Sequence, residues 1–106
     1  MKEHYSFMIE NSESYKVHIV ILTWNNNKIL KRCLESIENV DRKNFTISVI
    51  DNNSSDDSLR MISENFPNVQ TIKNSKNFKF GRGYNQGLKK INVEDNDFII
   101  LLNDDT

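Results

Sequence analysis

Short apolar runs alternate with segments of helical periodicity from residue 17 onward. The runs have the length and the β-branched character of buried strands. They fall at residues 17–23, 45–50, 69–72 and 97–102. Apolar residues at helical spacing predict helices from residue 27, from residue 54 or 55, and over residues 82–91. The order β-α-β-α-β-α-β predicts an α/β fold: a mainly parallel, Rossmann-like sheet with helices on both faces.

The second helix follows its strand after a short polar stretch. Ser54 or Ser55 is a suitable N-cap, because its hydroxyl oxygen can accept a hydrogen bond from a free backbone amide of the first turn. The spacing of the apolar residues that follow predicts one buried face. This face would contain Leu59, Ile62 and Phe66.

The length of 106 residues allows one domain, which we expect at residues 17–106 after a polar extension at residues 1–16. The content of 37% hydrophobic and 27% charged residues is typical of a globular protein. With a net charge of -1 the chain lacks the basic excess of most nucleic-acid-binding proteins, so no nucleic acid partner is expected. No apolar run has membrane-spanning length, and the single cysteine, Cys33, excludes an intrachain disulfide. The expected location is cytoplasmic.

A polar segment follows each of the four predicted strands. These segments cover residues 23–27, 51–57, 73–83 and 103–106. The carboxyl ends of parallel strands meet at one edge of a sheet, and ligands bind beyond that edge. We therefore expect the segments to converge on a single cleft. Trp24 lies beside this cleft, where it could line a ligand site or only pack against its neighbours.

The segment at residues 51–57 admits two interpretations. Asn, Asp and Ser are ordinary turn residues, so the segment could be a plain strand-to-helix connection. Alternatively, the Asp51 carboxylate could accept hydrogen bonds from a nucleobase N–H or from ribose hydroxyls, as acidic residues do in other nucleotide-binding α/β folds.

The glycines at Gly81, Gly83 and Gly87 also admit two interpretations. Their spacing and their position after the third strand do not match the dinucleotide-binding fingerprint. Backbone amides at a flexible helix start, together with Arg82, could face a diphosphate. Equally, the glycines could serve only to let the helix approach the sheet closely.

Two adjacent carboxylates, those of Asp104 and Asp105, follow shortly after the last predicted strand. Neighbouring negative charges are costly unless they are compensated, and a hard divalent cation compensates them well. Alternation along a strand would place Asn103 and Asp105 on one face and Asp104 on the other. A solvated acidic turn is the alternative.

The polar clusters together resemble family 2 glycosyltransferases. The matching stretches are residues 20–25, 49–58, 77–87 and 101–106, and their order and spacing also match. The resemblance covers residues 17–106 and implies the nucleotide-sugar-binding half of an A-type glycosyltransferase domain. It implies an enzyme that transfers a sugar, with inversion, from a UDP- or dTDP-linked donor to an acceptor hydroxyl in bacterial cell-surface polysaccharide synthesis.

The resemblance also implies roles for individual residues. Those near the nucleotide or donor sugar would be Thr23, Asn25, Asp51, Asn53, Ser54, Asp56, Arg82, Asn85 and Asp104. Asp105 would hold Mn²⁺ or Mg²⁺ against the diphosphate, which places the main metal contact on one carboxylate because Asn103 occupies the first position of the D-x-D-like triplet.

The catalytic base of the family lies after the metal motif, so it is expected beyond Thr106, and the isolated chain is expected to be inactive. Its other expected partners are a saccharide or lipid-linked acceptor, the inner face of the membrane through peripheral contact, and a second copy at the exposed sheet edge. A non-catalytic nucleotide-binding module stays open as an alternative. A nucleotidyltransferase also stays open, although residues 23–28 contain no glycine.

Overall fold

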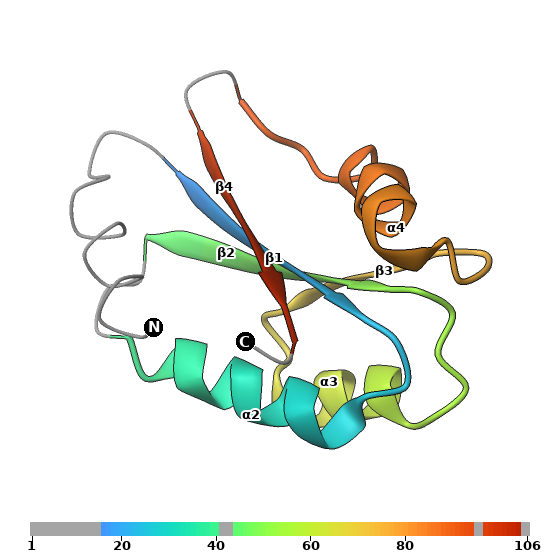
Figure 1. Cartoon of the computed structure of the whole chain (residues 1–106). Coiled ribbons are helices and arrows are strands. Elements are labelled where there is room, and N and C mark those ends of the chain that lie inside the picture. The colour runs from blue at the N-terminus through green and yellow to red at the C-terminus, as the bar shows by residue number, and fades with distance from the viewer. Residues whose placement is uncertain (1–15, 41–43, 95–96, 105–106) are drawn as a thin grey trace.

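The computed structural model describes residues 16–40, 44–94 and 97–104 (Figure 1). Its elements are β1 (Val17–Thr23), α2 (Asn27–Glu38), β2 (Phe45–Asp51), α3 (Ser58–Asn65), β3 (Gln70–Lys73), α4 (Lys79–Leu88) and β4 (Phe98–Asn103). The strands form one parallel sheet in the order β3-β2-β1-β4. The predicted α/β fold with a parallel sheet is therefore confirmed. Of the predicted extension at residues 1–16, residues 1–15 lie outside the described residues.

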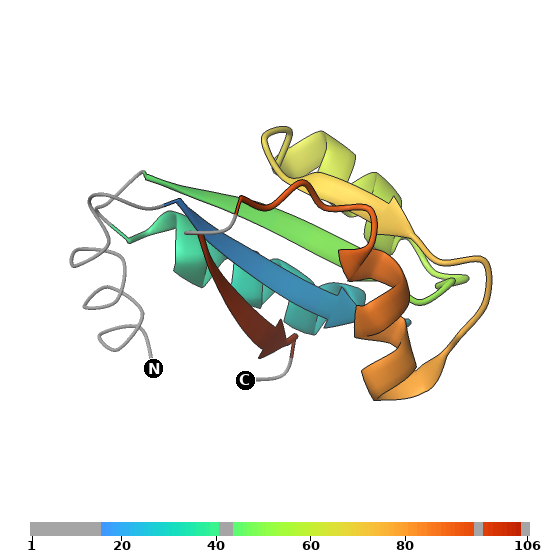
Figure 2. The same cartoon turned by 90° about the horizontal axis from the view of Figure 1, so that it is seen from above.

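The helices cover both faces of the sheet, as Figures 1 and 2 show. Successive connections from β1 to β2 to β3 run in one direction, and α2 and α3 pack on one face. The connection from β3 to β4 runs back past β1, and α4 packs on the other face. This distribution is the one that right-handed crossovers require.

Two apolar clusters follow from this layering. The larger one joins alternate residues of β1, such as Ile19 and Ile21, to buried residues of α2 and α3. The smaller one joins the other face of β1, at Val20 and Leu22, to Tyr84 of α4. Because both faces are covered, all residues of β1 are buried, which explains why it is apolar at all but two positions, His18 and Thr23.

The second helix differs from its prediction. It begins at Ser58, and neither Ser54 nor Ser55 caps it. Ile62 and Phe66 are buried as predicted, but Met61 is buried where Leu59 was expected, and Leu59 is only partly buried. The hydroxyl groups of Ser54 and Ser55 are instead hydrogen-bonded to Asn25, in the loop after β1, so they are not available to cap the helix.

The third helix begins earlier than predicted, at Lys79 rather than at Arg82. The prediction was misled by the low helix propensity of Gly81 and Gly83. Packing on the sheet overrides that propensity, since Gly83 and Gly87 lie buried within α4. The helix ends at Leu88, and β3 and β4 each lie one residue later than predicted at both ends.

Candidate functional site

A cleft of about 560 Å³ opens at the carboxyl ends of β1, β2 and β4, beside the start of α4. Its lining residues are Leu22, Thr23, Trp24, Asn26, Asn52, Asn77, Lys79, Phe80, Asn103 and Asp104. Each of the four predicted polar segments contributes to this list, so the predicted convergence on one cleft is confirmed. Trp24 is 51% exposed, which favours its interpretation as a cleft-lining residue over one that only packs.

The cleft contains a contact between the first and last strands. The buried Thr23 hydroxyl donates a hydrogen bond to Oδ2 of Asp104 over 2.8 Å. The strand order reverses between β1 and β4, and parallel α/β sheets bind ligands at such a switch point. Thr23 therefore holds a carboxylate at the position where this fold provides a ligand site.

The Asp104 carboxylate also affects two groups beneath the cleft. Burial raises the pKa of the Cys33 thiol from 9.0 to about 11, and the negative charge of Asp104 adds to the increase. Burial likewise raises the pKa of Tyr84 to about 12, again with a contribution from Asp104. The Tyr84 hydroxyl donates a hydrogen bond to the backbone carbonyl of Leu102. Both groups are therefore protonated near neutral pH, and neither provides a base for chemistry.

Asn25, Ser54 and Asp56 form a brace between the loops that follow β1 and β2. The Asn25 backbone amide donates to the Ser54 hydroxyl over 2.9 Å. The Asn25 side-chain oxygen accepts from the backbone amides of Ser55 and Asp56 over 2.7 and 3.3 Å. Asn25 has a φ of 47°, which Asn tolerates better than most residues. These three residues thus fix the shape of the loops beside the cleft.

Asp51 lies fully buried at the end of β2. Its Oδ2 accepts a hydrogen bond from the Ser54 backbone amide over 2.8 Å, while Oδ1 is buried without a partner. A buried carboxylate oxygen without a donor is costly, so such a group invites an explanation. A ligand N–H that reached it after a small movement of the loop would supply the missing donor.

Asn52 is a central residue of the site that the sequence analysis missed. Its side-chain amide donates to the Lys79 carbonyl over 2.9 Å. Its side-chain oxygen accepts from the Asn74 side chain over 3.0 Å and from the Phe78 backbone amide over 3.3 Å. Asn52 thus attaches the end of β2 to the start of α4. Nothing in the sequence distinguishes it from Asn53, which is exposed in a neighbouring hollow of about 360 Å³.

Lys79 is the second residue that the sequence analysis missed. It lines the cleft and has a φ of 65°, an unfavourable backbone conformation for a residue with a Cβ. The Lys79 backbone amide donates a hydrogen bond to the Asn77 side-chain oxygen over 2.8 Å, and the Lys79 carbonyl accepts one from the Asn52 side chain. These contacts hold a cationic side chain at the opening of the cleft.

Arg82 and Asn85 lie away from the cleft, although both are on α4. Arg82 stacks over the Phe78 ring, with 5.5 Å from its guanidinium carbon to the ring centroid. It lines a separate hollow of about 450 Å³. Asn85 is exposed and lines none of the three hollows described here. The structure therefore brings Thr23 and Asp104 together in the cleft and leaves these two residues apart from it.

The glycines of α4 divide into two kinds. A Cβ at Gly83 would lie 2.6 Å from the side-chain nitrogen of Asn52, and a Cβ at Gly87 would overlap the Ile50 side chain. Gly81 has open space around it. Close packing of helix on sheet thus explains two of the three glycines.

The metal prediction concerns Asp105, which lies outside the described residues. Within residues 16–40, 44–94 and 97–104, no group of three His, Cys, Asp or Glu side chains is arranged to hold a metal. The Asp104 carboxylate in the cleft lining is an oxygen ligand of the kind that a hard cation such as Mn²⁺ or Mg²⁺ prefers. Such an ion would depend on Asp105 and on ligand oxygens for further coordination.

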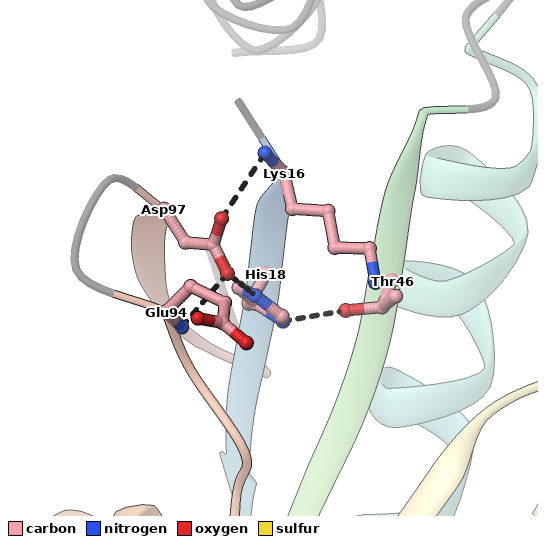
Figure 3. Close-up of polar contacts among 5 residues, drawn as sticks. All are labelled: Lys16, His18, Thr46, Glu94 and Asp97. Carbon is pink, nitrogen blue, oxygen red and sulfur yellow. Dashed lines mark hydrogen bonds and ion pairs between the residues drawn. The ribbon is translucent and has the colours of Figure 1, made fainter. Parts of the chain in front are cut away.

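A polar cluster lies at the amino-terminal end of β1, opposite the cleft (Figure 3). The imidazole of buried His18 contacts the Thr46 hydroxyl and the Asp97 carboxylate, each over 2.9 Å. The hydrogen bond from His18, followed by those from the Glu94 and Lys16 backbone amides, lowers the pKa of Asp97. His18 therefore has a structural role, because it ties β1 to β2 and to the residue before β4.

The parallel sheet and the cleft at its switch point define an α/β domain with a ligand site at the carboxyl ends of the strands. The chain belongs to glycosyl transferase family 2, because the family model matches residues 18–106. The resemblance found in the sequence is therefore confirmed.

Two relatives match most of the chain. A Methanococcus voltae protein, dolichyl N-acetyl-alpha-D-glucosaminyl phosphate 3-beta-D-2,3-diacetamido-2,3-dideoxy-beta-D-glucuronosyltransferase, is 34% identical over 80% of this chain and 27% of its own length. A Campylobacter jejuni protein, GalNAc(5)-diNAcBac-PP-undecaprenol beta-1,3-glucosyltransferase, is 31% identical over 85% of this chain and 29% of its own length. The chain thus spans less than a third of either relative.

Solved structures share the fold. S. aureus TarS in complex with UDP-GlcNAc has a TM-score of 0.72 and 24% identity, covering 85% of this chain and 26% of its own. The mannosyltransferase PcManGT from Pyrobaculum calidifontis, in complex with GDP-Man and Mn²⁺, has a TM-score of 0.71 and 15% identity, covering 98% of this chain and 35% of its own. The expected A-type glycosyltransferase fold is confirmed. Among the described residues, no helix is both long and apolar enough to cross a membrane.

Proposed function

We propose that this chain binds a nucleoside-diphosphate sugar in the cleft and forms the donor-binding part of an inverting glycosyltransferase. The observation that carries the proposal is the Thr23–Asp104 contact at the switch point, where a carboxylate is held in an open cleft. Membership of glycosyl transferase family 2 supports it, as does the binding of nucleotide sugars by TarS and PcManGT on the same fold.

In this proposal Asp51 receives an N–H of the nucleobase or a ribose hydroxyl, which would satisfy its unpartnered oxygen. A pyrimidine base, carried by UDP or dTDP, is the expected choice. Asp104 contacts the ribose or the donor sugar. Thr23 acts by orienting Asp104. Asn25, Ser54 and Asp56 act indirectly, by bracing the loops that shape the base pocket.

The diphosphate is expected to lie toward the start of α4, where free backbone amides and cationic side chains favour negative charge. Lys79 lines the cleft itself and is suited to this role. Arg82 and Asn85 keep their expected role near the base or the diphosphate in this proposal, although neither of them lines the cleft. Asp105 would hold Mn²⁺ or Mg²⁺, and this ion would neutralise charge on the departing diphosphate.

The proposal names no residue of this chain as the catalytic base or as a contact of the acceptor. The names of the M. voltae and C. jejuni relatives refer to lipid-linked saccharides, which supports a lipid-linked acceptor in cell-surface glycan synthesis. Three residues of β4, Phe98, Ile99 and Leu101, are between 41% and 49% exposed. Further polypeptide or a second copy of the chain would cover this edge of the sheet.

The test is a calorimetric titration of the chain with UDP, dTDP, GDP and ADP, each with and without Mn²⁺. Asp51→Asn and Asp104→Asn are the test variants, and Asp57→Asn, in the exposed turn before α3, is the matched control. We expect metal-dependent binding of a pyrimidine diphosphate that both test variants weaken by about tenfold or more and the control retains. Equal binding by all variants would contradict the proposed site. Metal-dependent binding without transfer by the complete protein would favour a non-catalytic module.

A further inference from the structure

The charge of the chain is distributed unevenly along its sequence. Residues 65–93 contain six Lys and Arg residues and no Asp or Glu. All 15 acidic residues and the other eight basic residues lie elsewhere, although the net charge of the whole chain is only -1. The basic segment forms β3, α4 and the loop between them. In Figure 1, α4 and the loop that leads into it lie on the opposite side of the sheet from α2.

Two basic side chains of this segment lie over one aromatic ring, that of Phe78. The Lys76 ammonium lies 5.3 Å from the centroid of the Phe78 ring, and the Arg82 guanidinium lies 5.5 Å from it. Phe78 also lines two hollows. Lys73 and Lys90 line one of them, and Lys76, Lys79 and Arg82 line the other. We call Phe78 and these five cations the Phe78 surface.

The Phe78 surface has no internal charge compensation. No Asp or Glu lines either hollow, and no ion pair joins any of its five cations to a carboxylate of the described residues. Cations so close together repel one another, and an anionic partner would relieve that repulsion. The surface is therefore suited to an extended array of negative charge.

An exposed aromatic side chain next to this surface indicates what kind of anionic partner the surface would bind. Phe80 follows Lys79 in the chain and is 57% exposed, with its ring edge against Tyr84. A cluster of four to eight cations beside exposed aromatic side chains is the pattern of proteins that lie on anionic lipid bilayers: cations bind the headgroups while an aromatic ring enters the interface. A nucleic acid is disfavoured, because the chain as a whole is not basic.

We propose that the Phe78 surface docks on an anionic lipid bilayer, with Lys73, Lys76, Lys79, Arg82 and Lys90 on the headgroups and Phe80 at the interface. Lys79 belongs both to this surface and to the cleft, so docking would bring the cleft to the membrane surface. The inference does not depend on glycosyl transfer, since four of the five cations line hollows outside the cleft and only Lys79 is shared with it.

The test is co-sedimentation of the full chain with phosphatidylcholine vesicles, with and without phosphatidylglycerol. We expect binding to the anionic vesicles that is at least about tenfold tighter than to the neutral ones and that weakens with added salt. The charge-reversed pair Lys76→Glu with Lys90→Glu is expected to abolish that preference. The matched control is Lys28→Glu with Lys31→Glu, which makes the same charge change on exposed residues of α2.

Three results would overturn the proposal. One is equal binding to the two kinds of vesicle, or none. Another is an equal loss of binding in the α2 control, which would mean that net charge alone decides. The third is displacement of the chain from the vesicles by UDP with Mn²⁺ or by an RNA oligonucleotide, at a competitor concentration below the lipid concentration that saturates binding. That result would mean that the surface serves the competing ligand instead. Circular dichroism of both double variants checks that they are folded.

Discussion

The Thr23 hydroxyl donates a hydrogen bond of 2.8 Å to the Asp104 carboxylate, although 81 positions separate the two residues in the sequence. Thr23 is the last residue of β1, and Asp104 follows the last residue of β4. The two strands are neighbours in the sheet. The chain adds β2 and β3 on one side of β1 and then adds β4 on the other side. A contact between their ends therefore orients a carboxylate in the crevice that this topology creates.

Thr23→Val tests that contact, because valine keeps the shape of threonine and removes the donor. We expect the variant to lose about 1.5–3 kcal/mol of unfolding free energy, as for a hydrogen bond to a charged group, and to bind nucleotide more weakly. Urea denaturation and calorimetry measure the two effects. Thr23→Ser is expected to restore binding, whereas Thr46→Val, at the opposite end of the sheet, should leave it intact. Unchanged binding by Thr23→Val would mean that the contact is only structural.

The glycines of α4 give a second prediction, since only some of them are packed. Gly87→Ala places a methyl group against Ile50 and is expected to cost about 1–3 kcal/mol of stability. Gly83→Ala meets the Asn52 side chain and should cost a similar amount. Gly81→Ala has free space and is expected to stabilise the protein by up to about 1 kcal/mol through helix propensity. Three equal changes in thermal or urea unfolding would refute this division.

Backbone strain at Lys79 gives a third prediction. Its φ of 65° favours glycine, so Lys79→Gly is expected to raise the free energy of unfolding by about 1 kcal/mol. Lys89, at the other end of α4, has an ordinary φ of -60°, so Lys89→Gly is the matched control and should lower stability by up to about 1 kcal/mol. A loss of stability in both variants would show that the conformation of Lys79 is not strained.

The Asp97 carboxylate gives a prediction about pH. Its pKa is lowered below the ordinary 3.8, chiefly by the hydrogen bond from His18 and then by the Glu94 backbone amide. A lowered pKa in the folded state adds stability above pH 3.8, and this contribution disappears as the pH falls through the folded value. Asp97→Asn is therefore expected to be less stable than the wild type at neutral pH, with a difference that shrinks in acid below pH 3.8.

Urea denaturation across the acid range measures that difference. The matched control is Glu94→Gln: Glu94 binds Asp97 through its backbone amide, so its side chain should not affect the acid response. A difference between wild type and Asp97→Asn that stays constant down to the lowest pH would contradict the assignment.

The sequence by itself determined the order of the strands and helices and the parallel arrangement of the sheet. It also placed the polar segments at one edge, since the carboxyl ends of parallel strands must meet there. These features depend on local properties, namely apolar runs and periodicity, which can be read within a few turns of chain. Thr23 and Asp104 lie in polar segments located in this way, whereas their individual roles were implied by the family resemblance.

Only the tertiary structure decided which polar residues face the cleft and which support it. Asn52 is buried and joins β2 to α4, while its neighbour Asn53 is exposed. Ser54 was expected to cap a helix but binds Asn25, which is 29 positions away in the sequence. Such partners come from distant segments that meet only when the chain is folded, so no local pattern reveals them. The sequence fixes where polar groups end a strand, but the fold assigns each of them its partner.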